Sequence, residues 1–188
     1  MIELITDYVQ KIFHISQYIK KDEVHHYNEV INGSYDVKKV LITNSLCING
    51  QAKLVDGVVA EKNITVNGKL LSQKATFQSD LTVNGDVSLQ DTIIRGDAQF
   101  RGRINAKDSV LNSVEILSDQ SFFNNCQLKN LIIKELPKNN RLQRITLTHN
   151  TQITGDIIFN SGHGEVLCDA RSKVQGKIIG GKLIPKEG

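Results

Sequence analysis

The feature that most constrains the fold is an Asn-Gly pair that recurs at a nearly constant interval. The pairs are Asn49-Gly50, Asn67-Gly68 and Asn84-Gly85, and each follows apolar residues on alternate positions. Glycine accepts a positive φ without a Cβ clash, and asparagine tolerates one, so the pair suits a tight corner. A hairpin meander would instead show mirrored strands at variable spacing. The fixed period, about 17–18 positions, therefore favours a β-solenoid, in which successive strands end at the same corner.

Apolar and polar residues alternate between the corners, which predicts short strands with one side chain inward and the next outward. The side chains expected inward are Leu46, Ile48, Ile64, Val66, Leu81, Val83, Ala98, Phe100, Val114 and Ile116 on the first strands, Ala52, Leu54, Val87, Leu89, Ile104 and Ala106 on the second, and Ala75, Phe77, Thr92 and Ile94 on the third. Thr65, Thr82 and Gln99 would form an outward column. The expected fold is all-β: a right-handed parallel β-helix, triangular in section, over residues 35–188.

Residues 1–34 follow a different pattern. Their apolar residues recur every three or four positions, which is typical of an amphipathic α-helix. The residues expected at the interface of this helix are Ile5, Tyr8, Ile12, Ile15 and Ile19. We expect this segment to be a helical cap or arm, followed by a linker, that covers one end of the solenoid or packs along it. A helix–helix oligomer interface and binding to a membrane surface are the alternatives.

Residues 134–144 interrupt the alternation and are predicted to form an extruded loop, because Pro137 cannot donate to a strand ladder. Basic residues gather in this loop, and the candidate anion-binding residues are Lys134, Lys138, Arg141 and Arg144. If they meet on one side, they would bind a phosphate-bearing ligand or an anionic lipid surface. The same residues can instead form a solvated edge that discourages sheet extension. The segment has no stacking aromatic residues, so no specific nucleic acid partner is predicted.

The sequence contains no recognisable catalytic or metal-binding constellation, so we expect no catalytic residue, cofactor or metal. Adjacent histidines such as His25 and His26 rarely point at one ion. A hexapeptide-type acyltransferase is an alternative, but a period of about 17 positions does not divide into sixes. Such an enzyme would also use a histidine base, and we expect His149 and His163 to be corner residues.

Three cysteines without a CxxC pair, and the lack of an apolar run of about 20 residues, predict a cytoplasmic protein. Attachment to a membrane surface through the first segment remains the alternative. Cys47 is expected to point outward, and Cys126 and Cys168 to point inward as small hydrophobic residues. The net charge of +3 at pH 7 is mild and indicates no particular partner.

A short motif of apolar, variable, Gly, polar and apolar residues recurs in the repeats, as in Val83–Val87 and Ile153–Ile157. Over roughly residues 40–184 these runs resemble the bactofilin-like, polymer-forming cytoskeletal proteins of bacteria. The resemblance implies a right-handed β-helix that polymerises end to end without a nucleotide. The chain departs from this family in its long amphipathic segment and its basic loop.

The function expected from these patterns is that of a non-enzymatic scaffolding protein that forms a homo-oligomer. It would self-associate through the ends of the solenoid, where Leu183 and Ile184 form the C-terminal edge, or through the N-terminal helix. The alternatives are a binding module or effector that uses the basic loop to hold an anionic membrane surface or protein, and the acyltransferase.

Overall fold

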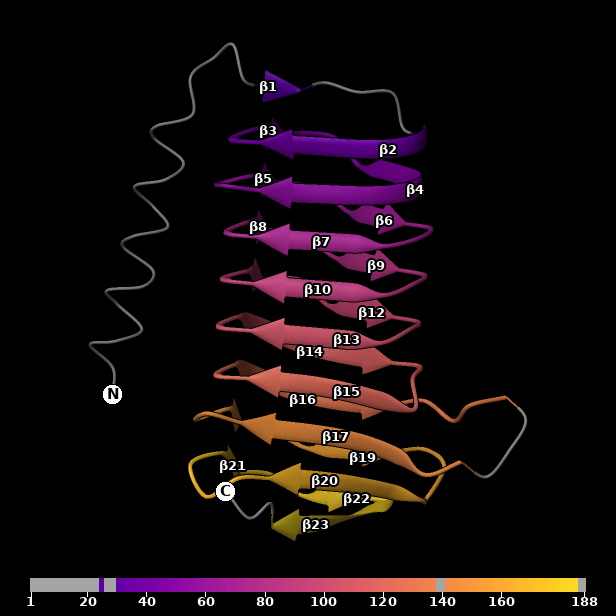
Figure 1. The fold of residues 1–188 in the computed structure, drawn as a ribbon, viewed down its shortest axis with the longest axis vertical. Helices are drawn as coiled ribbons and strands as arrows, with labels where there is room; N and C mark the ends of the chain where they lie inside the picture. The colour runs from indigo at the N-terminus through magenta and orange to yellow at the C-terminus, as the bar shows by residue number, and fades with distance from the viewer. Residues whose placement is uncertain (1–23, 26–29, 138–140, 186–188) are drawn as a thin grey trace.

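The computed structural model of the chain is a parallel β-solenoid of about nine turns, stacked along one axis (Figure 1). It describes residues 24–25, 30–137 and 141–185, with side-chain burial from residue 30 onward. These residues form strands, turns and loops, and contain no helix, so no described helix could cross a membrane. The predicted N-terminal helix, with Ile5, Tyr8, Ile12, Ile15 and Ile19, lies outside the described residues.

The strands stack in three parallel ladders, which we call faces A, B and C. Face A consists of β1 (Val24–His25), β3 (Leu41–Ile42), β5 (Val59–Ala60), β8 (Thr76–Phe77), β11 (Ile93–Ile94), the first parts of β14 (Val110–Ile116) and β16 (Gln127–Ile133), β18 (Gln152–Ile153) and β21 (Lys173–Val174). Face B consists of the first parts of β2 (Val30–Lys38) and β4 (Leu46–Val55), β6 (Ile64–Val66), β9 (Leu81–Val83), β12 (Ala98–Phe100), the last parts of β14 and β16, β19 (Ile157–Phe159) and β22 (Ile178–Ile179). Face C consists of the last parts of β2 and β4, β7 (Leu70–Gln73), β10 (Val87–Gln90), β13 (Ile104–Lys107), β15 (Gln120–Asn124), β17 (Gln143–Thr148), β20 (Gly164–Cys168) and β23 (Gly181–Pro185).

The register of the ladders confirms the repeat predicted from the sequence. Ile64 pairs with Leu81 and Val87 pairs with Ile104, in each case one period further along the chain. All the side chains predicted to point inward are buried, and they form one continuous core along the axis. Equivalent side chains of neighbouring coils therefore lie directly above one another, which is the packing that a solenoid requires.

The corner between faces B and C is made by the predicted glycines. Gly50, Gly68 and Gly85 have φ values of 152° to 159°, which favour glycine over residues with a Cβ. A Cβ built on Gly68 would overlap the carbonyl oxygen of Gly50 in the coil above, and Gly85 stands in the same relation to Gly68. Glycine is thus required at this corner both by backbone conformation and by the close approach of the next coil.

The asparagines before these glycines form an exposed ladder of side-chain hydrogen bonds. The amide nitrogen of Asn49 donates to Asn32 Oδ1 (2.9 Å), that of Asn67 to Asn49 Oδ1 (2.8 Å), and that of Asn84 to Asn67 Oδ1 (2.7 Å). The ladder starts at Asn32, because β2 begins at Val30 and pairs along its length with β4. Strand pairing therefore extends further toward the N-terminus than the boundary expected at residue 35.

The corner between faces C and A has a feature that was not predicted from the sequence. Its residues have φ values of 47° to 55° although none of them is glycine, and they are Lys39, Asp56, Lys74, Asp91, Asp108, Asn125 and His149. This conformation costs a residue with a Cβ about 1 to 3 kcal/mol. The backbone N–H of Lys74 donates to Gln90 O (2.9 Å) and that of Asp91 to Lys107 O (3.1 Å). Hydrogen bonds to the next coil thus hold the strained corner in place.

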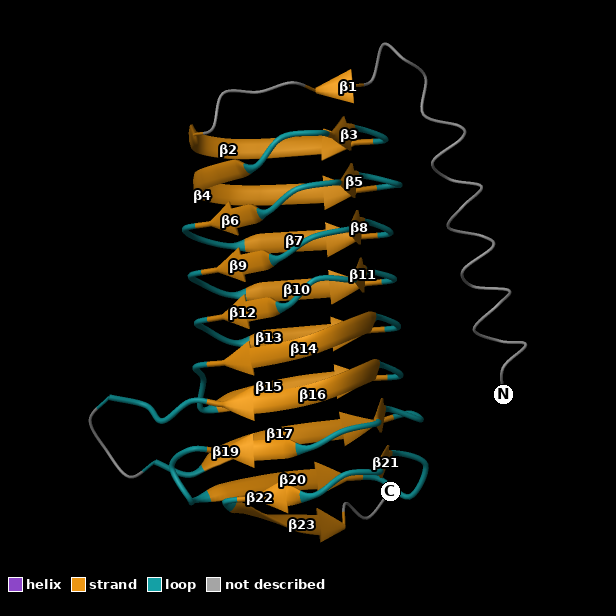
Figure 2. Ribbon diagram, turned by 180° about the vertical axis from the view of Figure 1, so that it is seen from behind, coloured by secondary structure: helices purple, strands orange, loops and turns teal. Residues whose placement is uncertain are grey.

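A loop leaves the stack between β16 and β17, as predicted (Figure 2). Ile104 pairs with Ser121 one period further on, but Ser121 pairs with Ile145, so the coil that contains the loop is longer than its neighbours by a short insertion. The buried Gln143 closes the base of the loop, since its side-chain nitrogen donates to Lys134 O (2.8 Å) and Ser118 O (3.0 Å). The coils above and below therefore stay stacked.

We predict that Gly68→Ala lowers the free energy of unfolding by roughly 2 kcal/mol more than Gly33→Ala, measured by urea denaturation. Both glycines have positive φ, so both substitutions carry the conformational cost. A Cβ at Gly33 meets nothing within 4 Å, whereas one at Gly68 overlaps the coil above. Equal losses for the two variants would show that contact between the coils does not determine this corner.

Candidate functional site at the C-terminal end

The last coil of the solenoid has paired strands on one side only. Strands β21, β22 and β23 pair with β18, β19 and β20, and no other described strand pairs with them. The opposite edge of this coil therefore presents backbone N–H and C=O groups without a ladder partner among the described residues. An open edge of this kind is a template for pairing with another chain.

The same end exposes a cross-section of the apolar core. Leu183 continues the column of Val166, which is fully buried, yet Leu183 is 54% exposed. Val174 and Ile178 continue the buried columns of Ile153 and Ile157 and are half-buried. Of the two edge residues predicted from the sequence, Leu183 thus belongs to the open core section, and Ile184 pairs with Leu167 on the outer side of face C.

The two ends of the solenoid differ. In the first coil whose side chains are described, the inward residue Tyr35 is only 6% exposed, and Ile31 and Val37 are half-buried. The equivalent of Tyr35 in the last coil is Leu183, which is half exposed. The C-terminal end is therefore the more open of the two.

A buried carboxylate fixes the last coils to one another. Glu165 is 8% exposed, and its oxygens accept from Arg144 (2.9 Å) in the coil above and contact Lys182 Nζ (3.1 Å) in the coil below. The hydrogen bonds from Arg144 and then Lys182 hold the pKa of Glu165 below its ordinary value. The carboxylate is therefore charged at neutral pH and links β17, β20 and β23.

The edge also carries features that limit the range of its partners. Lys173 and Lys177 are exposed beside the last strands, and Pro185 lacks a backbone N–H to donate. Lysine and proline at a sheet edge discourage indiscriminate strand addition. The edge is therefore open but carries residues that oppose the addition of an arbitrary extended strand.

Apolar side chains continue from this end onto the outer surface of two faces. On face B they are Ile179, Ile158 and Ile132 in successive coils, and on face C they are Ile184 and Leu167, which Thr146 separates from Phe122. Ile179 is 46% and Phe122 44% exposed. The open core section is thus bordered by further apolar surface.

The four predicted anion-binding residues differ in whether they have a carboxylate partner. Lys134 contacts Glu115 (3.1 Å) and Arg144 contacts Glu165 (2.9 Å), so both have a carboxylate partner within the solenoid. Arg141 is exposed in the loop, and Lys138 lies outside the described residues. The described part of the loop therefore presents one cation without an ion-pair partner, and an anion site here stays a prediction.

The cysteines lie as predicted. Cys47 is half-buried on the outer side of face B, Cys126 is fully buried, and Cys168 packs against the core. The described residues contain no group of three or more His, Cys, Asp and Glu side chains that could hold a metal.

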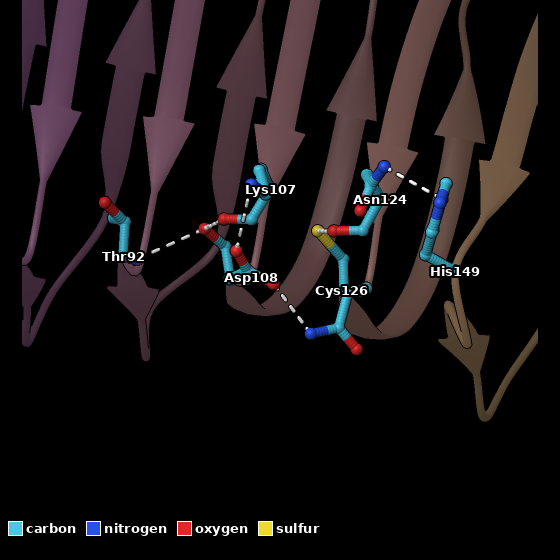
Figure 3. Close-up of polar contacts among 8 residues, drawn as sticks. Thr92, Lys107, Asp108, Asn124, Cys126 and His149 are labelled. Carbon is cyan, nitrogen blue, oxygen red and sulfur yellow. Dashed lines mark hydrogen bonds and ion pairs between the residues drawn. The ribbon is translucent and has the colours of Figure 1, made fainter.

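Cys126 belongs to a column of small buried polar side chains at the corner between faces C and A. Thr92, Ser109 and Thr151 occupy the equivalent positions in the neighbouring coils and are at most 1% exposed. Ser109 Oγ donates to Lys107 O (2.7 Å), and Cys126 Sγ donates in the same way to Asn124 O (3.3 Å) (Figure 3). The thiol thus takes the place of a hydroxyl that donates to the carbonyl oxygen two residues earlier in the same coil.

The surroundings of Cys126 do not suit a nucleophile. Burial raises the pKa of its thiol from 9.0 to about 11. His149 is exposed, and its Nδ1 lies 3.0 Å from the side-chain nitrogen of Asn124. The thiol is therefore protonated at neutral pH and is engaged with a backbone carbonyl.

We predict that alkylation at pH 8.5 modifies Cys47 first and Cys126 only after unfolding, as measured by peptide mass spectrometry. A pKa of about 11 instead of 9.0 lowers the thiolate fraction of Cys126 about 100-fold. Because the folded-state pKa is raised, the stability that this thiol contributes is complete below about pH 9 and is lost as the pH rises toward 11. Equal labelling of Cys126 and Cys47 in the folded protein would contradict this placement.

No protein-family model, curated protein or solved structure matches the chain. The two runs that resemble the bactofilin-like proteins lie at different corners, since Val83–Val87 joins faces B and C whereas Ile153–Ile157 joins faces A and B. The function must therefore be argued from the solenoid itself and from its open end.

Proposed function

We propose that this chain is a non-enzymatic scaffolding protein whose copies associate through the C-terminal end of the solenoid. The observation that carries the proposal is the exposed core section at this end, where Leu183 ends a column of buried side chains. A second copy can cover this section and the unpaired strand edge at once. The product is a rigid rod, which suits a structural role.

The expected complex is a two-fold dimer, because the N-terminal coil is the less open end. A two-fold contact uses the same surface on both copies, and dimers of this kind are the commonest protein assemblies. Burying the exposed part of Leu183 would stabilise the dimer by roughly 1 kcal/mol per copy. Each contact is modest and Lys173 and Lys177 of the two copies repel, so the association depends on protein concentration and on salt.

The same proposal includes that the chain is bactofilin-like. It also includes that the coils are triangular in section and wind in a right-handed sense. The three ladders of parallel strands support the triangular section. Connections between parallel strands are right-handed in about 98% of cases, which supports the winding. Within such a family this chain would form short, defined assemblies rather than long filaments.

The experiment compares Leu183→Asp with Leu142→Asp by light scattering over a concentration series in about 0.3 M salt, which screens the lysines. Leu142 is a matched control, because it is 45% exposed but lies in the loop, away from the end. We expect the wild type and Leu142→Asp to approach twice the monomer mass as concentration rises. Leu183→Asp should remain a monomer, since a carboxylate in the contact would be buried without a partner.

A wild-type mass that stays at one monomer over the whole series would contradict the proposal. So would an association that Leu142→Asp abolishes and Leu183→Asp does not. Growth beyond the dimer that Leu183→Asp abolishes would support the use of this end and show that the N-terminal end also takes part.

A further inference from the structure

Face A carries a column on its outer side in which four of five residues are apolar. Its members are Leu41, Val59, Thr76, Ile93 and Val110, one from each of five successive coils. Below Val110 the column becomes polar, since the equivalent residues are Gln127, Gln152 and Lys173. The strands β3, β5, β8 and β11 lie above one another along one side of the solenoid, so this column is straight (Figure 2).

One residue of this column is buried although its side chain points away from the core. In β5, Ala60 faces the core and is fully buried, while Val59 faces outward and is still only 7% exposed. Leu41, Ile93 and Val110 are half-buried. Outward residues of the inner coils on face B, such as Ile132 and Ile158, are likewise half-buried, so Val59 is the residue of this column whose burial stands out. An apolar outer column that contains so buried a residue is typical of a sheet face that is covered.

The chain itself supplies a segment that can reach this column. Strand β1 pairs with β3 on face A, so the residues before Val24 join the solenoid at the top of the column. As a helix, residues 1–19 would be about 27 Å long at about 1.5 Å per residue. The five coils of the column span about 19 Å at about 4.8 Å per coil. The segment is therefore long enough, and it is attached at the right end.

The spacing of the apolar stripe also matches the spacing of the coils. The stripe residues Ile5, Tyr8, Ile12, Ile15 and Ile19 recur on average about every 3.5 positions, or about 5.3 Å along a helix. This is close to the distance of about 4.8 Å between coils. A helix that runs down face A would thus present one stripe residue to each coil, from Ile19 near Leu41 to Ile5 near Val110.

We propose that residues 1–20 dock as an amphipathic helix along face A of the same chain, with their apolar stripe on the column from Leu41 to Val110. The helix then joins five coils as a brace on one side of the rod. Its stripe is no longer free for another copy or a membrane. This leaves the C-terminal end as the open surface, but the inference does not depend on association through that end.

The test is a disulfide between the helix and the column in full-length protein that also carries Cys47→Ser and Cys168→Ser. Tyr8→Cys is combined with Ile93→Cys, the matched coil, or with Gln152→Cys, which occupies the same column three coils further down. Mild oxidation is followed by peptide mapping and a non-reducing gel. We expect a disulfide within one chain for Tyr8→Cys with Ile93→Cys, and roughly tenfold less for the pair with Gln152→Cys.

A disulfide between two chains would overturn the proposal, because the stripe would then cover a second copy. Equal oxidation of both pairs, or none of either, would overturn it as well. A second measurement uses proteins with the natural cysteines: trypsin should cleave after Lys11 roughly tenfold faster in Ile93→Asp than in Gln152→Asp. Protection of Lys11 that arises only when anionic vesicles are added would show that the stripe binds a membrane and would also overturn the proposal.

Discussion

The structure depends on one interaction, the backbone ladder that joins each coil to the next in a fixed register. Every position of a coil lies over the same position of its neighbour, about 4.8 Å away. Residues of one column along the axis therefore share a side of the coil and, at the corners, a backbone conformation. The glycine column of Gly50, Gly68 and Gly85 and the asparagine ladder beside it are direct consequences. So is the column of Thr92, Ser109 and Cys126, in which a thiol takes the place of a hydroxyl.

The same ladder accounts for the open end on which the proposed function rests. A stack of coils does not close on itself, so its last coil keeps an unpaired edge and an exposed slice of core. Here the C-terminal coil leaves Leu183 half exposed, while Glu165 holds that coil in place through Arg144 and Lys182. The end is apolar and bordered by Lys173 and Lys177. The scaffolding role that we propose rests on this combination.

The sequence predicted the parts of the fold that repeat with a distinctive residue. The Asn-Gly corners and the inward residues could be identified directly, because glycine at a positive φ and period-two alternation have clear signatures. The corner between faces C and A was not predicted, although Asp, Asn and His, which tolerate a left-handed backbone, fill five of its seven described positions; Lys39 and Lys74 carry no such signal. Its conformation is imposed by hydrogen bonds to the next coil. Asn32-Gly33 lies one period before Asn49-Gly50 and belongs to the first coil, although the sequence pattern of residues 1–34 predicts a helical segment and a linker.

The candidate site was harder to predict than the fold. Leu183 could be placed at the C-terminal edge, but its exposure depends on where the stacking stops. Glu165 is far from both Arg144 and Lys182 along the chain, so only the register of the coils brings the three together. Lys134 likewise has its partner Glu115 in the preceding coil. Ion pairs between neighbouring coils therefore determine which basic residues of the loop have a carboxylate partner. A local sequence motif cannot predict such pairs, because the partners are far apart along the chain.

The most direct test of this account is amide hydrogen exchange of the last coil at low and high protein concentration. The amides of β21, β22 and β23 that do not donate to the preceding coil should exchange quickly in dilute protein and become protected as concentration rises, whereas the amide of Lys173, which donates to Thr151 O, should be protected throughout. Amides of β10 and β13, in the middle of the stack, should be equally protected throughout and serve as the internal reference. Protection of the last coil that is the same at every concentration would contradict the claim that this end is the surface through which the protein associates.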